Sequence, residues 1–350
     1  MEELEALLST YFTKECPGAA VIMIHDNKII HRKGYGLADV YTGKRITTKT
    51  IFDIGSVTKH FTATGIMILV EKGRLDYNDR LSEIFPQFPK YAEKITVRHL
   101  LHHTSGLKDY EDLFVESGKI KEDWVKPVKI VRSKFEPTAD DVIDLLSKQK
   151  RLHFNPGEKW QYSNSGYVVL AKIIEEISGR TFPQFMKEEV FLPSGMEHSY
   201  VYDKDTPRID NRAKSYRLTD GEMMNADYTP FNFIYGDGNV NTNADDMHRW
   251  HKALCNSSLV DGKSFRQSIR PGKLNDGSQT GYGYGWFISK QLSHRKVHHS
   301  GSWCGFVSSM SYFPIEKITV AVLSNLEQFG YSIVNIASVV SKKYLKSQKG

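Results

Sequence analysis

Strand-like segments gather at the two ends of the chain, whereas its middle is predominantly helical in pattern. Residues 19–24 and 28–34 are β-rich and flank the turn Asp26-Asn27, which is a hairpin signal. Four further strand-like segments lie near the C-terminus: residues 282–288, 297–299, 305–313 and 318–324. Between residues 75 and 230, turns alternate with helical periodicity. This order predicts an α/β fold of the α+β type, with an antiparallel sheet flanked by helices and an inserted, mostly helical lobe.

The same order predicts how the chain divides into domains. We expect residues 1–74 and 236–350 to form one discontinuous α/β lobe, and residues 75–235 to form the helical lobe. Helices are expected where an apolar period follows a capping signal, at residues 2–13, 56–72, 138–148, 164–177, 242–254 and 330–345. Residues 108–137 are charged and aromatic without a clear period, which favours a mobile surface excursion or lid.

The composition argues against two classes of partner. The 350 residues are 40% hydrophobic and 25% charged, which is typical of a globular protein. The net charge of +6 is mild and the basic residues are scattered, so we expect no nucleic-acid partner. The densest basic run, from Lys342 to Lys349, fits a solvated helix end. No apolar run approaches the length of a membrane span.

The start of the chain bears on its compartment. The first eight residues, Met1 to Leu8, are acidic and amphipathic, unlike the basic and then apolar start of a signal peptide. We therefore expect either a cytoplasmic protein or a processed secreted or periplasmic form. No sequence pattern predicts the oligomeric state.

Metal-binding patterns are weak. The chain has three cysteines: Cys16, Cys255 and Cys304. They have no metal-ligand spacing, and their odd number rules out complete pairing within the chain, so free thiols are expected. Neither histidine pair, His102/His103 or His248/His251, has a third ligand at a convincing spacing. We expect no metal and no cofactor.

A serine and a lysine three residues apart form the first candidate for chemistry. Ser56 follows Gly55 at the expected start of a helix, and Lys59 would lie on the same helix face. A helix N-terminus favours developing negative charge, which suits a nucleophile that must lose a proton. The bare spacing occurs four times, at Ser56/Lys59, Ser105/Lys108, Ser147/Lys150 and Ser293/Lys296. Only the first has the glycine turn and the long helix, and its alternative interpretation is an ordinary N-capping serine.

The second candidate is Tyr162-Ser163-Asn164, the one Tyr-x-Asn of the chain, at the start of an expected helix. Tyr162 can act as a general base if a cation such as Lys59 holds it as a phenolate. Asn164 offers both a donor and an acceptor to an amide. The alternative is that Tyr162 packs in the core while Asn164 caps the helix.

The third candidate is the late strand segment that contains His299-Ser300-Gly301-Ser302. A histidine, hydroxyls and a glycine on a strand can line a cleft, and glycine allows a substrate to approach the backbone. The N–H of Ser302 could then pair with that of Ser56 as an oxyanion hole. The alternative is a surface histidine beside a bulged strand.

Together, and in this order, the three motifs resemble the serine β-lactamase and penicillin-binding protein superfamily. The nearest subgroup is the class C β-lactamase-like serine hydrolases, which include D,D-peptidases, D-aminopeptidases and related esterases. Three further stretches are similar: residues 100–107, Pro156-Gly157 ahead of Tyr162, and residues 301–306. The resemblance covers about residues 17–345, nearly the whole chain.

The resemblance implies a β-lactamase/transpeptidase-like fold, with the active site in the cleft between the two lobes. It implies that Ser56 is the acylated nucleophile and that Lys59 and Tyr162 handle its proton. Tyr162 would later assist the attack of water on the acyl-enzyme. The N–H groups of Ser56 and Ser302 would form the oxyanion hole.

The resemblance also implies a set of substrate contacts. Asn164 would hold the substrate amide, and His299, Ser300 and Gly301 would contact its carboxylate or acyl tail. Two features depart from the family pattern. The third motif is His-Ser-Gly rather than Lys-Thr-Gly, and a partly charged histidine would grip a carboxylate weakly. Residues 236–242 are also more polar than is usual there.

Related esterases carry Trp-x-Gly as their third motif, and Trp303-Cys304-Gly305 matches that string. We interpret this match as accidental, because Gly305-Phe306 already fits the glycine-aromatic pair that follows the third motif.

The predicted function is a serine hydrolase that acts through a covalent acyl-enzyme on amide or ester bonds of a small molecule or peptide. D-amino-acid peptides and small esters are the favoured substrates, and the histidine argues against efficient β-lactamase activity. Two alternatives stay open at this point: an acyltransferase that uses the same acyl-enzyme, and a non-catalytic penicillin-binding module.

Overall fold

The computed structural model describes residues 2–121 and 133–347. Its centre is a six-stranded sheet in which every neighbouring pair is antiparallel. The strands, in spatial order, are β10 (Phe287–Gln291), β11 (His294–Trp303), β12 (Phe306–Phe313), β13 (Ile318–Ser324), β1 (Ala19–His25) and β2 (Lys28–Tyr35). The two ends of the chain therefore meet in one sheet, and the predicted fold class is confirmed.

Both faces of the sheet are covered, and strand β1 shows how the sequence achieves this. Its side chains alternate between two apolar clusters: Ala20, Ile22 and Ile24 face one, while Ala19, Val21 and Met23 face the other. Successive side chains of a strand point to opposite faces, so a continuous apolar strand requires a layer on each side. The hairpin from β1 to β2 turns at Asp26 and Asn27, which have φ of 48° and 64°.

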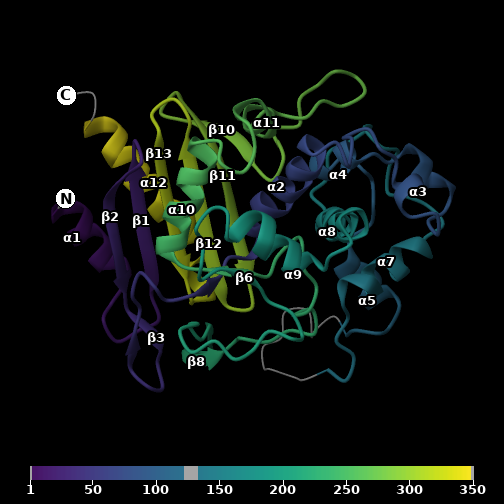
Figure 1. The fold of residues 1–350 in the computed structure, drawn as a ribbon. Helices are drawn as coiled ribbons and strands as arrows, with labels where there is room; N and C mark the ends of the chain where they lie inside the picture. The colour runs from purple at the N-terminus through teal and green to yellow at the C-terminus, as the bar shows by residue number, and fades with distance from the viewer. Residues whose placement is uncertain (1, 122–132, 348–350) are drawn as a thin grey trace.

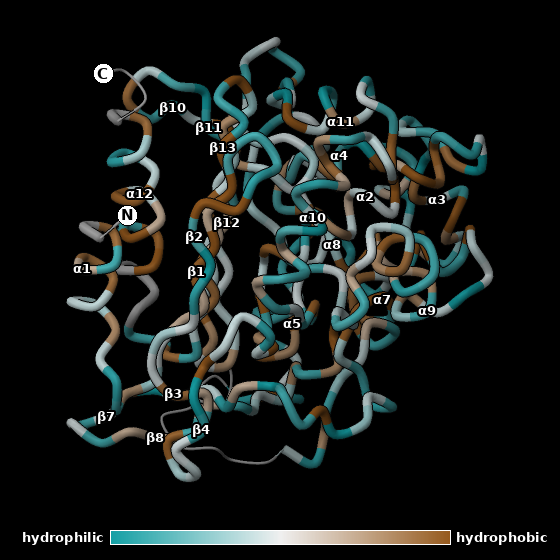
Figure 2. The backbone as a smooth tube through the Cα atoms, turned by 60° about the vertical axis from the view of Figure 1, so that its left-hand side comes forward, coloured by the Kyte–Doolittle hydropathy of each residue, from teal (hydrophilic) through white to brown (hydrophobic). Residues whose placement is uncertain are grey.

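Helices form the two covering layers (Figures 1 and 2). On one face lie α1 (Glu2–Tyr11) and α12 (Gly330–Ser347), which pack with β1, β12 and β13. On the other face α10 (Ala244–Cys255) packs against β1 and β13. The second face also receives the turn Gly55–Val57, which contacts β11 and β12 and leads into α2 (Thr58–Glu71) and the helical part of the molecule.

The helical part surrounds α2 and α8 (Asn164–Ser178), which pack against each other. Gly65 makes this approach close, because a Cβ there would lie 2.8 Å from Cδ1 of Ile174. The remaining helices are α3 (Leu81–Ile84), α4 (Val97–Leu101), α5 (Tyr110–Glu116), α7 (Ala139–Ser147), α9 (Phe182–Phe185), α11 (Gly262–Ser268), and the single turns or short helices at Gly55–Val57, Lys90–Lys94, Met186–Phe191 and Glu327–Phe329.

Short strands complete the described structure: β3 (Leu37–Asp39), β4 (Lys44–Arg45), β5 (Phe52–Asp53), β6 (Tyr200–Val201), β7 (Tyr216–Thr219), β8 (Glu222–Asn225) and β9 (Val240–Thr242). Strands β5, β9 and β6 form a three-stranded sheet, and β7 and β8 form a hairpin. The predicted division at residues 74/75 and 235/236 stays a prediction. Residues 200–225 do carry strands, which the sequence pattern did not indicate.

Two other expectations change. The helix expected over residues 56–72 begins as a 3₁₀ turn at Gly55–Val57, and α2 starts at Thr58. Within residues 108–137, which were expected to form a mobile surface excursion or lid, α5 is a helix that buries Tyr110, Leu113 and Phe114. Residues 122–132 of that segment lie outside the described residues.

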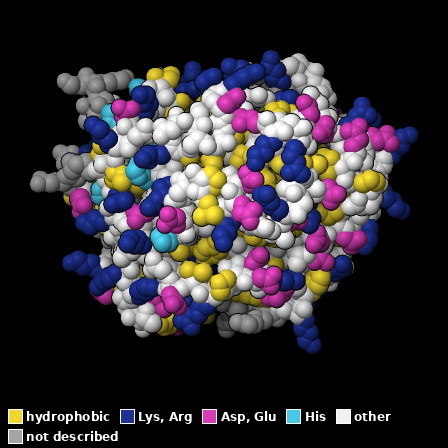
Figure 3. Space-filling model, in the orientation of Figure 1, with side chains coloured by type: hydrophobic (Ala, Val, Ile, Leu, Met, Phe, Trp, Pro, Cys, Tyr) yellow, Lys and Arg dark blue, Asp and Glu magenta, His cyan; other side chains and the backbone are white. Residues whose placement is uncertain are grey.

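On the face shown in Figure 3, Lys and Arg side chains are interspersed with Asp and Glu over the surface. No helix among residues 2–121 and 133–347 has the length and apolar character needed to cross a membrane.

Candidate active site

Ser56 lies in a tight turn that its neighbours hold in place. The backbone of Gly55 has φ of +49°, a left-handed conformation that favours glycine. The N–H of Gly55 donates to the carboxylate of buried Asp53 over 2.7 Å. The N-cap of α2 is Val57 and no side chain caps it, so the interpretation of Ser56 as a capping serine is wrong. The turn instead presents Ser56 to a cavity.

Lys59 reaches Ser56 from the first turn of α2 although its side chain is fully buried. Its Nζ lies 3.1 Å from Oγ of Ser56, 2.9 Å from Oδ1 of Asn164 and 2.8 Å from the carbonyl oxygen of Asp237. Burial lowers the pKa of Lys59 to about 8, although three nearby carboxylates oppose the shift. A substantial fraction of Lys59 is therefore neutral near physiological pH, and a neutral amine can accept the proton of Ser56.

Several titratable groups face Lys59 from the elements packed around it. They are Asp109 and Glu111 at the start of α5, Asp237 ahead of β9, His103 after α4, Tyr162 and Tyr167 around the start of α8, and His299 on β11. The carboxylates raise the pKa of the amine, whereas the two histidines are buried and their own pKa values lie below the usual range.

Tyr162 completes the group around the nucleophile. Its ring centre lies 4.9 Å from Nζ of Lys59. Burial raises the pKa of Tyr162 well above its usual value of 10, and a hydrogen bond with Ser56 only partly opposes this. The expectation that Lys59 holds Tyr162 as a phenolate is therefore corrected, because the phenol keeps its proton and can donate it.

The start of α8 is held by His103, a buried residue just after α4, and by Asp109, the half-buried N-cap of α5. The N–H of Ser163 donates to Nδ1 of His103 over 3.1 Å, and the His103 ring lies 4.4 Å from that of Tyr162. Ser163 caps α8, so Asn164 does not take the capping role that was the alternative. The carboxylate of Asp109 accepts from the N–H of Asn164 over 2.8 Å.

His299 does not face the cavity as the sequence suggested. It is 2% exposed, and its Nδ1–H donates to the carbonyl oxygen of Ser300 over 2.6 Å. This fixes Nε2 as the acceptor for the hydroxyl of Tyr282, 3.0 Å away. Burial lowers the pKa of His299 to about 3, so the expected partly charged imidazole is corrected to a neutral one. Ser300 is exposed on β11, and its contact with a substrate stays a prediction.

Gly301 brings β11 against the turn that carries Ser56. A Cβ at Gly301 would lie 2.0 Å from the carbonyl oxygen of Ile54, which also accepts from Oγ of Ser308 over 2.6 Å. On the other side, a Cβ at Gly55 would lie 2.8 Å from the nitrogen of Ser302. The strand and the turn are therefore in direct contact, with Ser56 and Ser302 both lining the cavity. The oxyanion hole expected from the N–H groups of Ser56 and Ser302 stays a prediction.

The cavity has a volume of about 260 Å³ and borders the nucleophile turn. Segments that are far apart in the sequence line the cavity. The lining residues are Gly55, Ser56, Tyr110, Glu111, Asn164, Arg217, Met224, Asn225, Ala226, Tyr228, Thr229, Ile234, Asp237, Gly238, Asn239, Ser302, Trp303, Cys304 and Glu327. The polar stretch at residues 236–242 thus contributes directly to the wall. Over the described ranges no cluster of three or more His, Cys, Asp or Glu could hold a metal ion, and the three cysteines are free thiols.

Sequence reasoning missed three acidic residues and a tyrosine of this site. Asp109, Tyr110 and Glu111 were part of the segment taken as a surface excursion, and Asp237 was noted without a role. The hydroxyl of Tyr110 donates to Oδ2 of Asp237 over 3.1 Å, which joins α5 to the segment ahead of β9. A signal did exist, since Asp109 is a helix N-cap followed by apolar residues at helical spacing.

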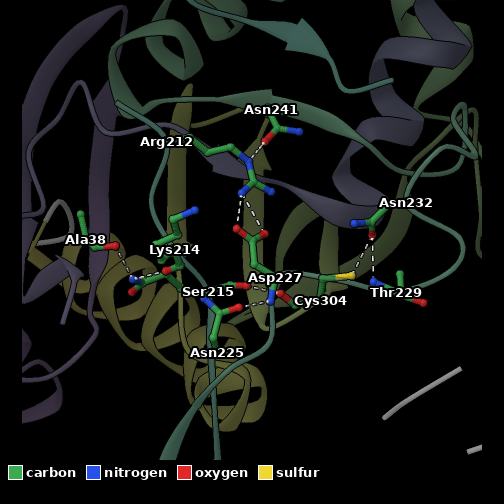
Figure 4. A network of polar contacts seen from close by, with 11 residues as sticks. Ala38, Arg212, Lys214, Ser215, Asn225, Asp227, Thr229, Asn232, Asn241 and Cys304 are labelled. Atoms are coloured by element: carbon green, nitrogen blue, oxygen red, sulfur yellow. Dashed lines mark hydrogen bonds and ion pairs between the residues drawn. The ribbon is translucent and has the colours of Figure 1, made fainter. Parts of the chain in front are cut away.

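A partly buried ion pair links the nucleophile turn to the loop beyond β6 (Figure 4). Nη1 of Arg212 contacts both carboxylate oxygens of Asp227, at 2.8 and 2.7 Å, and Nε donates to Oδ1 of Asn241. Asn241 pairs with Asp53 in the β5–β9 ladder. Since Asp53 accepts a hydrogen bond from the N–H of Gly55, this network also supports the backbone of the nucleophile turn.

The chain is similar to known proteins over most of its length. The family model described as Beta-lactamase matches residues 4–338. The chain is 33% identical over 344 residues to penicillin-binding protein 4* of Bacillus subtilis, covering 93% of this chain and 72% of that protein. It is 26% identical over 313 residues to a D-aminopeptidase of Brucella ovis, covering 89% of this chain and 57% of that protein.

Two solved structures show the same fold. The octameric penicillin-binding protein homologue from Pyrococcus abyssi superposes with a TM-score of 0.82 at 29% identity, over 99% of this chain and 77% of that one. The D-amino acid amidase from Ochrobactrum anthropi SV3, in complex with L-phenylalanine, gives a TM-score of 0.81 at 21% identity, over 99% of both chains.

Gly301→Ala tests the contact between β11 and the nucleophile turn. The added Cβ would force the two backbones apart and so displace the N–H groups of Ser56 and Ser302 that are expected to bind the oxyanion. We expect kcat for an ester to fall on the order of 10²-fold, measured per active site after titration with a covalent probe. Gly166→Ala in α8 is the matched control, because its Cβ would meet nothing closer than 3.6 Å. Equal kcat values for the two variants would contradict the assignment.

Proposed function

The chain belongs to the beta-lactamase family of serine hydrolases, and from this premise we propose that it acts through a covalent acyl-enzyme on Ser56. The observation that carries this proposal is the buried amine of Lys59, 3.1 Å from Oγ of Ser56 and with its pKa lowered to about 8. A weak nucleophile needs an adjacent group that takes its proton. A buried lysine with no such task would carry a large cost without a benefit.

Acylation proceeds through proton transfers among three side chains. Neutral Lys59 takes the hydroxyl proton of Ser56, and Oγ forms a bond to the carbonyl carbon of the substrate. The N–H groups of Ser56 and Ser302 stabilise the resulting oxyanion. As the tetrahedral intermediate collapses, Tyr162 donates its proton to the leaving nitrogen or oxygen. The proton now on Lys59 then restores the phenol of Tyr162.

Deacylation reverses these roles with water in place of the leaving group. Water attacks the ester carbon and gives up a proton towards the Lys59–Tyr162 pair. Oγ of Ser56 leaves as it regains a proton from the same pair. The raised pKa of Tyr162 suits a group that is a proton donor at rest, so Lys59 is the resting base.

The substrates that we propose are amides and peptides of D-amino acids, and small esters. Relatives of the chain include a protein named as a D-aminopeptidase and, by fold, a D-amino acid amidase. Neutral, buried His299 provides no positive charge for a carboxylate. Weak or absent β-lactamase activity follows, because the usual lactam substrates carry a carboxylate that this motif would have to bind.

Ser56→Ala tests the nucleophile. Because Oγ is the only atom lost, the fold and the thermal midpoint should be retained while labelling by a fluorophosphonate probe disappears. Hydrolysis of p-nitrophenyl acetate should fall on the order of 10⁴-fold. Ser105→Ala, which changes another serine of a Ser-x-x-Lys spacing, is the control and should still be labelled. Labelling that survives in Ser56→Ala would refute the proposal, and labelled protein without turnover would favour the non-catalytic alternative.

The pH dependence of acylation tests the base. Only neutral Lys59 accepts the proton of Ser56, so the acylation rate with an uncharged ester should rise with pH and level off above a pKa of about 8. Burst-phase release of p-nitrophenol between pH 6 and 10 measures it. Lys59→Arg keeps a positive charge at every one of these pH values, and it should lose the burst throughout. A wild-type rate that is flat across pH 7–9 would argue against Lys59 as the base.

A further inference from the structure

A buried carboxylate lies directly behind the nucleophile turn. Asp53 is 4% exposed, and its Oδ1 accepts from the N–H of Gly55 over 2.7 Å. The same carboxylate accepts a hydrogen bond from the side chain of Asn241, its partner in the β5–β9 ladder. A carboxylate accepts from both donors at once, whereas a protonated carboxyl or a neutral amide presents a donor at one of its two terminal atoms. Contact with both donors therefore depends on the ionised form.

The hydrogen bond from Gly55 fixes one end of a peptide unit whose other end is also held. That unit joins Ile54 to Gly55, and its carbonyl oxygen accepts from Oγ of Ser308 over 2.6 Å. Because a peptide unit is planar, two hydrogen bonds at its opposite ends set its orientation. The next peptide unit carries the N–H of Ser56, and its direction follows through the left-handed Gly55, with φ of +49°. Asp53 thus acts on the proposed oxyanion donor through one intervening residue.

The negative charge of Asp53 lowers the stability of the fold, which argues for a role beyond structure. Burial raises the pKa of Asp53 to about 6, whereas an aspartate in an unfolded chain has a pKa of about 4. As the pH rises from about 4 to about 6, the unfolded chain releases this proton first, so the folded state loses stability. The loss is complete above about pH 6. At neutral pH the chain therefore keeps an ionised carboxylate at a position where its charge is unfavourable.

Titratable groups face Asp53 from several elements. They are Tyr200 on β6, Arg212 between β6 and β7, Asp227 after β8, and Cys304 in the turn between β11 and β12. Arg212 lowers the pKa of Asp53 and Asp227 raises it. In the described contacts the guanidinium donates to Asp227 and Asn241 and not to Asp53. Burial raises the pKa values of Tyr200 and Cys304, so both are neutral near pH 7. Burial, rather than a direct ion partner, therefore dominates the charge state of Asp53.

We propose, on the basis of the acyl-enzyme function above, that Asp53 is a positioning residue for acyl transfer, whose ionised carboxylate holds the N–H of Ser56 where it can bind the oxyanion. It acts through the peptide unit that joins Ile54 to Gly55. Loss of the charge releases one end of that unit. Acylation then becomes slower at an unchanged affinity for the substrate, because the oxyanion forms only during the reaction.

Asp53→Asn tests this role, because the amide is neutral at every pH and keeps the size of the side chain. At pH 7.5 we expect the acylation rate with saturating p-nitrophenyl acetate to fall on the order of tenfold, with little change in the half-saturating ester concentration. Below about pH 5 the wild-type Asp53 is itself protonated, so the two rates should converge. The measurement is the burst of p-nitrophenol between about pH 4.5 and 8, expressed as the ratio of wild type to variant. Both proteins need neutral Lys59, so its titration cancels in this ratio.

Two further variants separate the charge of Asp53 from its place in the turn. Ser308→Ala removes the hydrogen bond at the other end of the same peptide unit and changes no charge, so it should slow acylation by a factor that stays constant with pH. Asp76→Asn is the matched control, since Asp76 lies in an exposed turn after α2 and its Oδ1 accepts from the N–H of Asn78 over 2.8 Å, in the same two-residue pattern. It should react at the wild-type rate at every pH.

The outcomes distinguish this inference from the proposed function. The inference is overturned if the ratio for Asp53→Asn is near one at pH 7.5, or if it is as large at pH 5 as at pH 7.5. If the variant does not fold, the wild-type profile decides. Below about pH 6 the wild-type rate must fall more steeply than the roughly tenfold per pH unit that Lys59 alone produces, and a constant slope refutes the role of Asp53. In each of these cases Ser56-dependent hydrolysis stands, whereas the absence of Ser56-dependent turnover at every pH refutes both proposals.

Discussion

The buried amine of Lys59 is the interaction on which the site depends. Removing an ammonium from water costs several kcal/mol even after the protein relaxes. Here the cost is offset by three hydrogen-bond acceptors on three elements: Ser56, Asn164 and the carbonyl group of Asp237. Each acceptor comes from a different part of the chain, so the turn Gly55–Val57, α8 and the segment ahead of β9 must all be in place before the amine is satisfied. Burial and the nearby carboxylates then act in opposite directions on its pKa, and burial prevails.

The second constraint is the close backbone contact between β11 and the nucleophile turn. Gly301 leaves room for the carbonyl oxygen of Ile54, and Gly55 leaves room for the nitrogen of Ser302. These two residues without side chains thus allow a close approach of the strand and the turn that carry the proposed oxyanion donors. The central sheet supplies the rigidity behind this contact, since both of its faces are buried under helices.

The sequence predicted those parts of the site that depend on short-range pattern, namely Ser56 with Lys59 and Tyr162 with Asn164. Each pair is close in the chain, so local backbone geometry keeps its members near each other. Asp109 and Glu111 could not be assigned in this way, because their value lies in contacts with segments more than 50 residues away. The apolar period of α5 extends over less than two turns, which is too short to stand out within a charged and aromatic segment. The strands β6 to β9 are two to four residues long and give no period at all.

The expectation that His299 is partly charged is wrong, and the reason is its burial. A histidine in water is partly charged near neutral pH, but this one is enclosed by Tyr282 and the strand backbone, and burial governs its charge. Where the family pattern has a lysine, this protein therefore has an uncharged group that positions a neighbour. Three carboxylates, those of Asp109, Glu111 and Asp237, lie close enough to Lys59 to raise its pKa. Neither the neutral His299 nor Lys59, which must lose its charge to act, offers a lasting positive charge to a substrate carboxylate, which is why carboxylate-bearing lactams are not among the substrates that we propose.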